Sequence, residues 1–110
     1  MTVPPFDLRV VRGAGRMHIA PCGELDIVTA PQLEEAISEA TSAAVPELVL
    51  DLRKLTFMDS TGLRTLAQAN QRAQQAGTRL SIWRGPHQIE RVLEISGLGP
   101  LLPLADPPAD

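Results

Sequence analysis

The 110-residue sequence has little of what several kinds of functional site require. A single cysteine, Cys22, excludes an intramolecular disulfide and a thiolate metal cluster, and it fits a reducing compartment. The aromatic residues are two Phe and one Trp, and the formal net charge is -3. The chain therefore lacks both the stacking surfaces and the basic field that bind nucleic acids, and we expect no direct nucleic-acid partner.

Signals for membranes, secretion and cofactors are missing as well. No apolar run approaches the roughly 20 residues of a membrane-spanning helix, and the opening MTVPPFDLRV lacks the basic and apolar regions of a signal peptide. The chain contains no paired carboxylates, no glycine-rich phosphate loop and no cluster of metal ligands. These absences predict a cytoplasmic protein with no membrane association, no cofactor and no bound metal.

Hydrophobic spacing predicts an alternation of strands and helices after an initial hairpin. The expected elements, in chain order, are strands at 6–12 and 16–25, a helix at 30–43, a strand at 47–52, a helix at 60–76, a strand at 79–83, a helix between Gly85-Pro86 and Gly97, and a short edge strand within 98–104. Thr29 and Gln32 match a capping box for the first helix, Pro86 suits the first turn of the third, and Gly77 and Gly97 suit left-handed helix ends.

This order predicts one α/β domain over residues 1–104, followed by a flexible proline-rich tail at 105–110. Because each strand-helix-strand crossover makes strands parallel while the hairpin is antiparallel, we expect a mixed sheet of four or five strands. The apolar segment 47–52 should lie in its middle, and the helices should lie mainly on one face. The predicted core residues are Leu48, Leu50, Leu52, Leu66, Ile82 and Val92.

The stretch LTFMDSTGLRTLAQ, residues 55–68, carries the clearest functional signal. Asp59, Ser60 and Thr61 are three potential helix caps in a row before Gly62, whereas a helix needs only one. Capping is the ordinary role for Ser60, but two of the three side chains remain available for another task. Phe57 and Met58 are expected to be partly exposed and to contact a partner.

Two chemical roles for Ser60 can be weighed. A nucleophile elbow needs a glycine where Met58 stands, and its only possible bases are His18 and His87, so a hydrolase is a poor match and we expect no enzyme. Alternatively, Ser60 is a phosphorylation substrate. A phosphate would add about 1.5 to 2 negative charges at a helix N-terminus, where it is tolerated, and would repel a partner docked there.

Three segments together resemble one known family. GELDIVTAPQLEEAI (23–37), LVLDLRKLTFMDSTGL (48–63) and ISGL (95–98) are similar to the single-domain STAS proteins that act as anti-sigma factor antagonists in bacterial partner switching. The combination of MDSTGL with the upstream GELD is the specific part of this resemblance. It covers most of the chain.

The resemblance implies a regulatory cycle. The dephosphorylated protein binds an anti-sigma factor with serine kinase activity and frees a sigma factor, phosphorylation of Ser60 ends binding, and a metal-dependent serine phosphatase restores it. By the same likeness, Asp59, Thr61 and Gly62 belong to the docking surface. Asp26 lies at the same end of the domain, where it either contacts the partner or braces the loop before the helix. We expect the protein to be a monomer alone. The alternative is a non-switching STAS scaffold or regulatory binding module, in which Ser60 only caps a helix.

Overall fold

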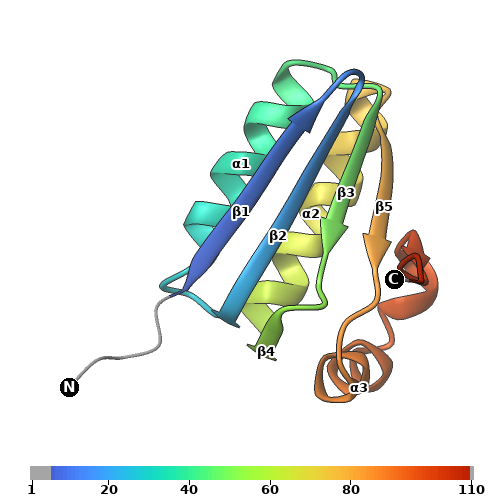
Figure 1. The fold of residues 1–110 in the computed structure, drawn as a ribbon. Helices are drawn as coiled ribbons and strands as arrows, with labels where there is room; N and C mark the ends of the chain where they lie inside the picture. The colour runs from blue at the N-terminus through green and yellow to red at the C-terminus, as the bar shows by residue number, and fades with distance from the viewer. Residues whose placement is uncertain (1–5, 110) are drawn as a thin grey trace.

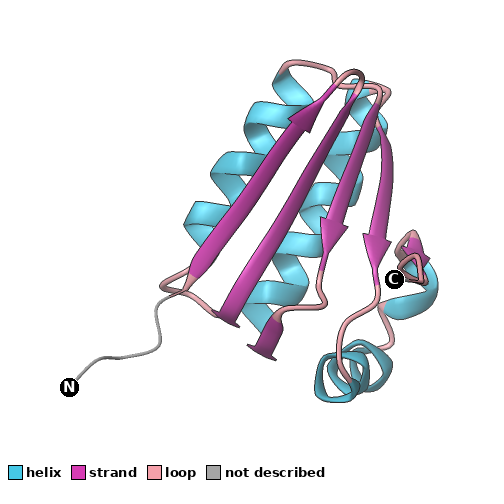
Figure 2. Cartoon of the chain, viewed as in Figure 1, coloured by secondary structure: helices cyan, strands magenta, loops and turns pink. Residues whose placement is uncertain are grey.

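The computed structural model describes residues 6–109 as three α-helices and six strands, with one short 3₁₀ helix (Figures 1 and 2). The elements are β1 (Asp7–Gly13), β2 (Arg16–Leu25), α1 (Ala30–Ser42), β3 (Glu47–Asp51), β4 (Leu55–Met58), α2 (Ser60–Ala76), β5 (Arg79–Trp83), α3 (His87–Ser96), the 3₁₀ helix η1 (Gly99–Leu101) and β6 (Leu104–Ala105). Residues 1–5 of the predicted domain, which are the first half of the opening decapeptide, and Asp110 of the predicted tail lie outside the described residues. No described helix is long and apolar enough to cross a membrane.

The sheet is mixed, as predicted. Its strand order is β1-β2-β3-β5-β6, with β4 paired to β2 beside this path. Only the β1–β2 hairpin is antiparallel, and the other four pairings are parallel. The apolar strand β3 lies in the middle, which confirms its predicted position.

The sheet has six strands where four or five were expected, because β4 was not predicted. It is only four residues long and follows a tight turn in which Leu55 N donates to Leu52 O. Its partner is the end of β2, where the register shifts between Gly23 and Glu24. This pairing is what brings the MDSTG segment beside the loop that follows β2.

Helices α1 and α2 lie together on one face of the sheet, and no described helix covers the opposite face of β1, β2, β3 and β5 (Figure 1). Helix α3 lies at the end of the sheet and contacts β4. Five predicted core residues are fully buried: Leu48, Leu50, Leu52, Leu66 and Ile82. Val92 is only partly buried, since Ile89 and Leu93 form the buried stripe of α3 instead.

The helix ends agree with the sequence at their carboxyl termini and differ at two amino termini. Gly77 and Gly97 adopt the expected left-handed conformation, with φ of 72° and 74°. The capping box at Thr29 is wrong, because the Thr29 side chain makes no cap bond to α1. Pro86 is the N-cap of α3 and not part of its first turn.

The predicted edge strand exists, but it lies at the end of the segment expected to contain it. Residues 99–101 form η1, and β6 then pairs with β5. Arg84 N donates to Ala105 O at 3.0 Å, so ordered pairing passes the predicted domain boundary at 104 by one residue. The flexibility of the remaining proline-rich tail stays a prediction.

Candidate functional site

Two loops meet at the carboxyl ends of β2 and β4. Leu25 at the end of β2 pairs with Met58 at the end of β4, and Asp59 N donates to Leu25 O at 3.3 Å. The chain after Leu25 turns through 26–29 into α1, while the chain after Met58 enters α2 directly. Asp26 and the Asp59–Gly62 segment, expected at the same end of the domain, are therefore brought together.

Asp59, and not Ser60, caps helix α2. Its backbone is extended, and its Oδ1 accepts hydrogen bonds from Thr61 N at 2.9 Å and Gly62 N at 3.3 Å. Its carbonyl oxygen accepts the bond from Leu63 N. An N-cap side chain that accepts from the second and third helical residues satisfies amides that the helix itself leaves free. The ordinary role considered for Ser60 is therefore already filled.

Ser60 is the first residue of α2, and its side chain is exposed. Within the described part of the chain its hydroxyl has no hydrogen-bond partner. Thr61 is partly exposed, and it contributes its carbonyl oxygen to a 3.0 Å bond from the Thr65 hydroxyl. Of the two neighbouring hydroxyls, Ser60 is thus the more accessible to a second protein.

Met58 is buried, which corrects the prediction that it is partly exposed. Its side chain is 2% accessible and belongs to the core. Successive strand residues point to opposite faces, so the exposed position in this pair is Phe57, at 46%. Phe57 is partly exposed, as expected.

Gly62 is buried too, for a packing reason. A Cβ atom at this position would overlap Met58 Cγ and press against the Leu25 side chain. The absence of a side chain therefore lets the first turn of α2 lie directly on β2 and β4. In this arrangement Met58 and Gly62 lie beneath the surface that they were predicted to contribute to, and they support it from within.

Asp26 braces the loop between β2 and α1. Its Oδ1 accepts hydrogen bonds from Val28 N at 2.9 Å and Thr29 N at 3.1 Å, and the Thr29 hydroxyl lies 3.2 Å from the same atom. Thr29 also donates its hydroxyl proton to Glu24 O at 2.7 Å. These bonds replace the predicted capping box and fix a tight turn.

That turn presents two apolar side chains that the sequence reasoning missed. Ile27 and Val28 are 74% and 78% exposed, although both are residue types that usually lie inside. Phe57 is also exposed and lies on β4, which pairs with the end of β2 that this turn follows; we call these three side chains the apolar rim. The sequence does contain a signal for these residues. Two aliphatic residues follow each other in the turn between Asp26 and Thr29, where neither a strand nor a helix pattern accounts for them.

Catalytic alternatives gain no support from the geometry. Within the described residues Ser60 has no hydrogen bond to either histidine. His18 lies on β2 about 20 Å before Leu25 at ordinary strand spacing, and its Nε2 is 3.0 Å from Asp51 Oδ2. His87 begins α3. No group of three or more potential metal-ligating side chains occurs among the residues that the structure describes.

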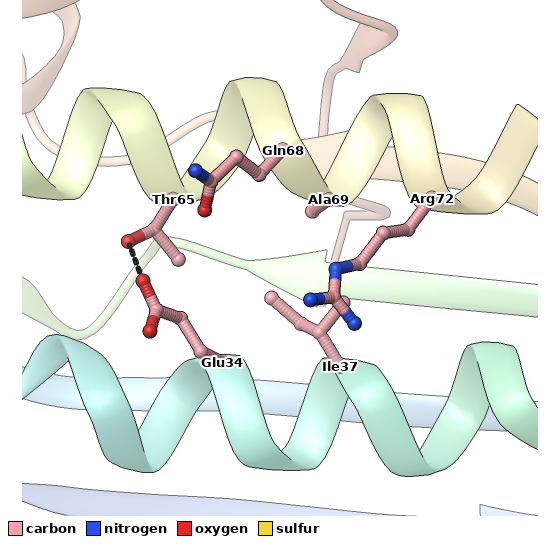
Figure 3. Close-up of a pocket in the computed structure, with 6 residues that line it drawn as sticks. All are labelled: Glu34, Ile37, Thr65, Gln68, Ala69 and Arg72. Atoms are coloured by element: carbon pink, nitrogen blue, oxygen red, sulfur yellow. Dashed lines mark hydrogen bonds between the residues drawn. The ribbon is translucent and has the colours of Figure 1, made fainter.

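A small cleft lies between α1 and α2 (Figure 3). Its volume is about 50 Å³, and the Thr65 hydroxyl donates to Glu34 Oε2 across it at 3.2 Å. Arg72 extends from α2 over Ile37 at the other end of the cleft. A space of this size holds water molecules but not a nucleotide.

The chain is similar to known proteins over most of its length. A family model described as the STAS domain matches residues 6–109. The anti-sigma-B factor antagonist of Staphylococcus aureus is 32% identical over 80 residues, covering 73% of this chain and 74% of the relative.

Two solved structures are also similar to this chain over most of its length. The crystal structure of an anti-sigma factor antagonist from Mycobacterium paratuberculosis matches with a TM-score of 0.85 and 30% identity, over 100% of this chain and 93% of that one. The Bacillus cell fate determinant SpoIIAA, in its phosphorylated form, matches with a TM-score of 0.71 and 26% identity, over 94% and 92% of the two chains.

Proposed function

This chain belongs to the STAS domain family, and from that premise we propose that it is an anti-sigma factor antagonist switched by phosphorylation of Ser60. The dephosphorylated form binds an anti-sigma factor that is also a serine kinase. Phosphorylation releases this partner, and a serine phosphatase resets the protein. The protein acts as a regulated binding partner, not as an enzyme.

One observation carries the proposal. Asp59 caps α2, and the Ser60 hydroxyl is exposed and has no hydrogen-bond partner among residues 6–109, so its modification breaks no hydrogen bond in that part of the chain. A phosphate at this position lies near the positive end of the helix dipole, where anions are stabilised. Arg64 follows one turn later, is exposed and has no ion pair with a described residue, so it lies within side-chain reach of the modified serine. The folded state should therefore tolerate the modification.

The surroundings of Ser60 explain how a phosphate would act on binding. The apolar rim of Ile27, Val28 and Phe57 offers the exposed hydrophobic area that a protein partner can cover. Asp26 holds two of these side chains in place through the turn, and Asp59 places a carboxylate beside the serine. A dianion introduced at the edge of such an interface must be desolvated or repelled, which favours dissociation.

The alternative, a non-switching STAS scaffold, assigned Ser60 to capping. Asp59 performs that role, so the alternative has no remaining reason for a hydroxyl at residue 60, and this favours the switch. The similarity to SpoIIAA, whose phosphorylated form is a solved structure, supports the same choice.

The direct test combines the purified chain with the anti-sigma factor kinase of the same organism and ATP, and follows binding and phosphate incorporation together. We expect one phosphate on Ser60, followed by release of the chain. Ser60→Ala should bind and resist ATP-driven release, whereas the matched variant Thr61→Ala should behave like wild type. Labelling of Thr61 in the Ser60→Ala protein, or undiminished affinity of the phosphorylated chain, would reject Ser60 as the switch.

A second arm tests the docking surface. Phe57→Ser should weaken binding of the dephosphorylated chain, because it removes an exposed ring from the apolar rim. Leu101→Ser is the matched control, since Leu101 is equally an exposed apolar residue but lies on η1, away from β4. Equal losses in the two variants would show that the rim is not the contact surface.

A further inference from the structure

The face of the sheet opposite α1 and α2 has an electrostatic character unlike the rest of the chain. We call it the open face. It is the face of β1, β2, β3 and β5 that no described helix covers (Figure 1), together with the turn after β3. Of the ten basic and thirteen acidic residues in the chain, this face carries five basic ones, namely Arg9, Arg16, Arg53, Lys54 and Arg79. Its acidic residues are only Asp7, Glu47 and Asp51. A net positive face on a chain of net charge -3 calls for an explanation.

A buried carboxylate organises the centre of the open face. Asp51 Oδ1 and Oδ2 accept bonds from Arg53 Nε at 3.0 Å and Nη2 at 2.9 Å, and His18 Nε2 lies 3.0 Å from Oδ2. Burial by itself raises the pKa of the Asp51 carboxyl, but hydrogen bonds from the Arg53 side chain and backbone and from His18, with the charge of Arg53, hold that pKa below its usual value. The carboxylate therefore stays ionised and fixes Arg53 and His18 in position.

Trp83 completes this centre from the next strand. The Arg53 guanidinium lies 5.1 Å from the Trp83 ring centroid and the Arg16 guanidinium lies 5.7 Å from it. The His18 ring centroid is 5.0 Å away. Arginine and tryptophan held rigidly at a surface are the residue types that contribute most to protein–protein affinity, because little side-chain entropy remains to be lost.

Beside this centre is a hollow of about 240 Å³, lined by Asp51 together with Arg9, Val11, His18, Ala20, Arg53 and Lys54. The side chains of Arg9 and Lys54 are exposed and have no ion pair with a described residue. Val11 on β1 also lines the hollow and is 61% exposed. The hollow thus offers an apolar side chain beside two cations that have no ion pair with a described residue.

We infer that the open face is a docking surface for an acidic segment of a partner protein, whose carboxylates pair with Arg9 and Lys54 while an apolar side chain covers Val11. A protein segment fits better than a small molecule, because the volume of the hollow, about 240 Å³, is below the roughly 300–1,000 Å³ of ligand pockets. It fits better than a nucleic acid, because the chain as a whole is acidic. This surface lies across the sheet from α2 and so is separate from Ser60, and the inference does not rest on the proposed switch.

The test uses the full chain and a defined acidic peptide, acetyl-Glu-Leu-Glu-Asp-Leu-Glu-amide, followed by two-dimensional amide NMR and by the fluorescence of Trp83, the single tryptophan. We expect shifts confined to β1, β2, β3 and β5, and binding that weakens as salt is raised. The neutral counterpart with Gln and Asn in place of Glu and Asp should not bind. Ser60→Glu should bind the acidic peptide as wild type does.

Two double variants with the same change in net charge provide the control. Arg9→Gln with Lys54→Gln should bind the peptide about fivefold more weakly or worse, as the loss of two exposed ion pairs predicts. Arg72→Gln with Arg91→Gln, which removes exposed cations from α2 and α3, should leave affinity within about twofold.

Four results would each overturn the inference. They are equal binding of the neutral peptide, equal losses in the two double variants, loss of binding in Ser60→Glu, and shifts reproduced with similar affinity by inorganic phosphate alone or by a single-stranded oligonucleotide. The first two results would show that these charges do not determine binding. The third would place the contact at the Ser60 surface, and the last would indicate a small anion or a nucleic acid as the partner. Failure of ATP-driven release at Ser60 would leave this result untouched, so the two proposals fail independently.

Discussion

We expect that replacing Asp59 lowers the stability of the protein, whereas replacing Ser60 leaves stability nearly unchanged and prevents regulation by phosphorylation. Asp59→Ala removes the acceptor for Thr61 N and Gly62 N, bonds of 2.9 Å and 3.3 Å, together with a negative charge at the start of α2. Loss of an N-cap costs about 0.5–2 kcal/mol of unfolding free energy. With one good bond, one long bond and a favourable charge–dipole term, we expect about 1.5 kcal/mol. In a domain of this size that lowers Tm by about 6 °C.

Two further variants separate the contribution of the Asp59 charge from that of its hydrogen bonds and from any contribution of the Ser60 hydroxyl. Asp59→Asn keeps an oxygen acceptor but not the charge, so it should lose only the charge–dipole part, about 0.3–1 kcal/mol. Ser60→Ala removes a hydroxyl that has no partner among the described residues, so the unfolding free energy should change by no more than about 0.5 kcal/mol.

Urea unfolding followed by far-ultraviolet circular dichroism measures all three variants against wild type, and an unchanged m-value ensures that the free energies are comparable. A larger loss of unfolding free energy in Ser60→Ala than in Asp59→Ala would show that Asp59 is not the cap. An Asp59→Ala protein as stable as wild type would show the same.

Two other predictions concern buried positions. Gly62→Ala should destabilise the protein by about 1–3 kcal/mol in urea unfolding, because the new Cβ overlaps Met58 Cγ and presses on Leu25; wild-type stability would show that the loop has room to move. Asp51 has a lowered pKa when folded, so its ionised form stabilises the fold above the unfolded-state pKa of about 3.9 and this contribution is lost as pH falls through the folded-state pKa. Asp51→Asn should therefore be less stable than wild type at neutral pH, with a gap that narrows below about pH 4; a gap independent of pH would contradict the assignment.

The parts of the fold that the sequence predicted are those where one strong local signal acts alone. Strand β3 has three consecutive apolar residues at its centre, 48–50, and α2 has seventeen residues with a continuous buried stripe, so neither pattern has a competing interpretation. Gly77 and Gly97 end their helices because only glycine adopts a positive φ without strain. These signals were sufficient for the mixed sheet and the helical layer.

The parts that were missed depend on pairing between distant segments. Strand β4 is too short to show a period, and it is a strand only because the end of β2 lies beside it. The same pairing decides that Met58 points inward and Phe57 outward, which a four-residue segment cannot reveal by itself. The burial of Gly62 follows in turn, because it depends on where Met58 and Leu25 lie.

The sequence predicted where the site lies, but not which of its residues caps α2 and which stays exposed. Asp59, Ser60 and Thr61 are all competent caps, and the choice among them depends on where the first helical turn begins. That point is set by the bond from Asp59 N to Leu25 O, a tertiary contact across 34 positions of sequence numbering, from 25 to 59. The capping box expected at Thr29 does not form for a similar reason, since the Thr29 hydroxyl accepts from Asp26 N and donates to Glu24 O.

The position of the cap also determines how a phosphate can act. Asp59 is tied to β2 through its backbone amide and to α2 through its side chain, and Gly62 lies on Met58 and Leu25 beneath it. Ser60 stands between these two anchored residues without taking part in either contact. Its hydroxyl is therefore held in a fixed position by bonds that do not involve it. A group added there changes the charge of the surface while every contact that holds the loop persists, so the proposed switch acts on the affinity for the partner and leaves the free energy of folding nearly unchanged.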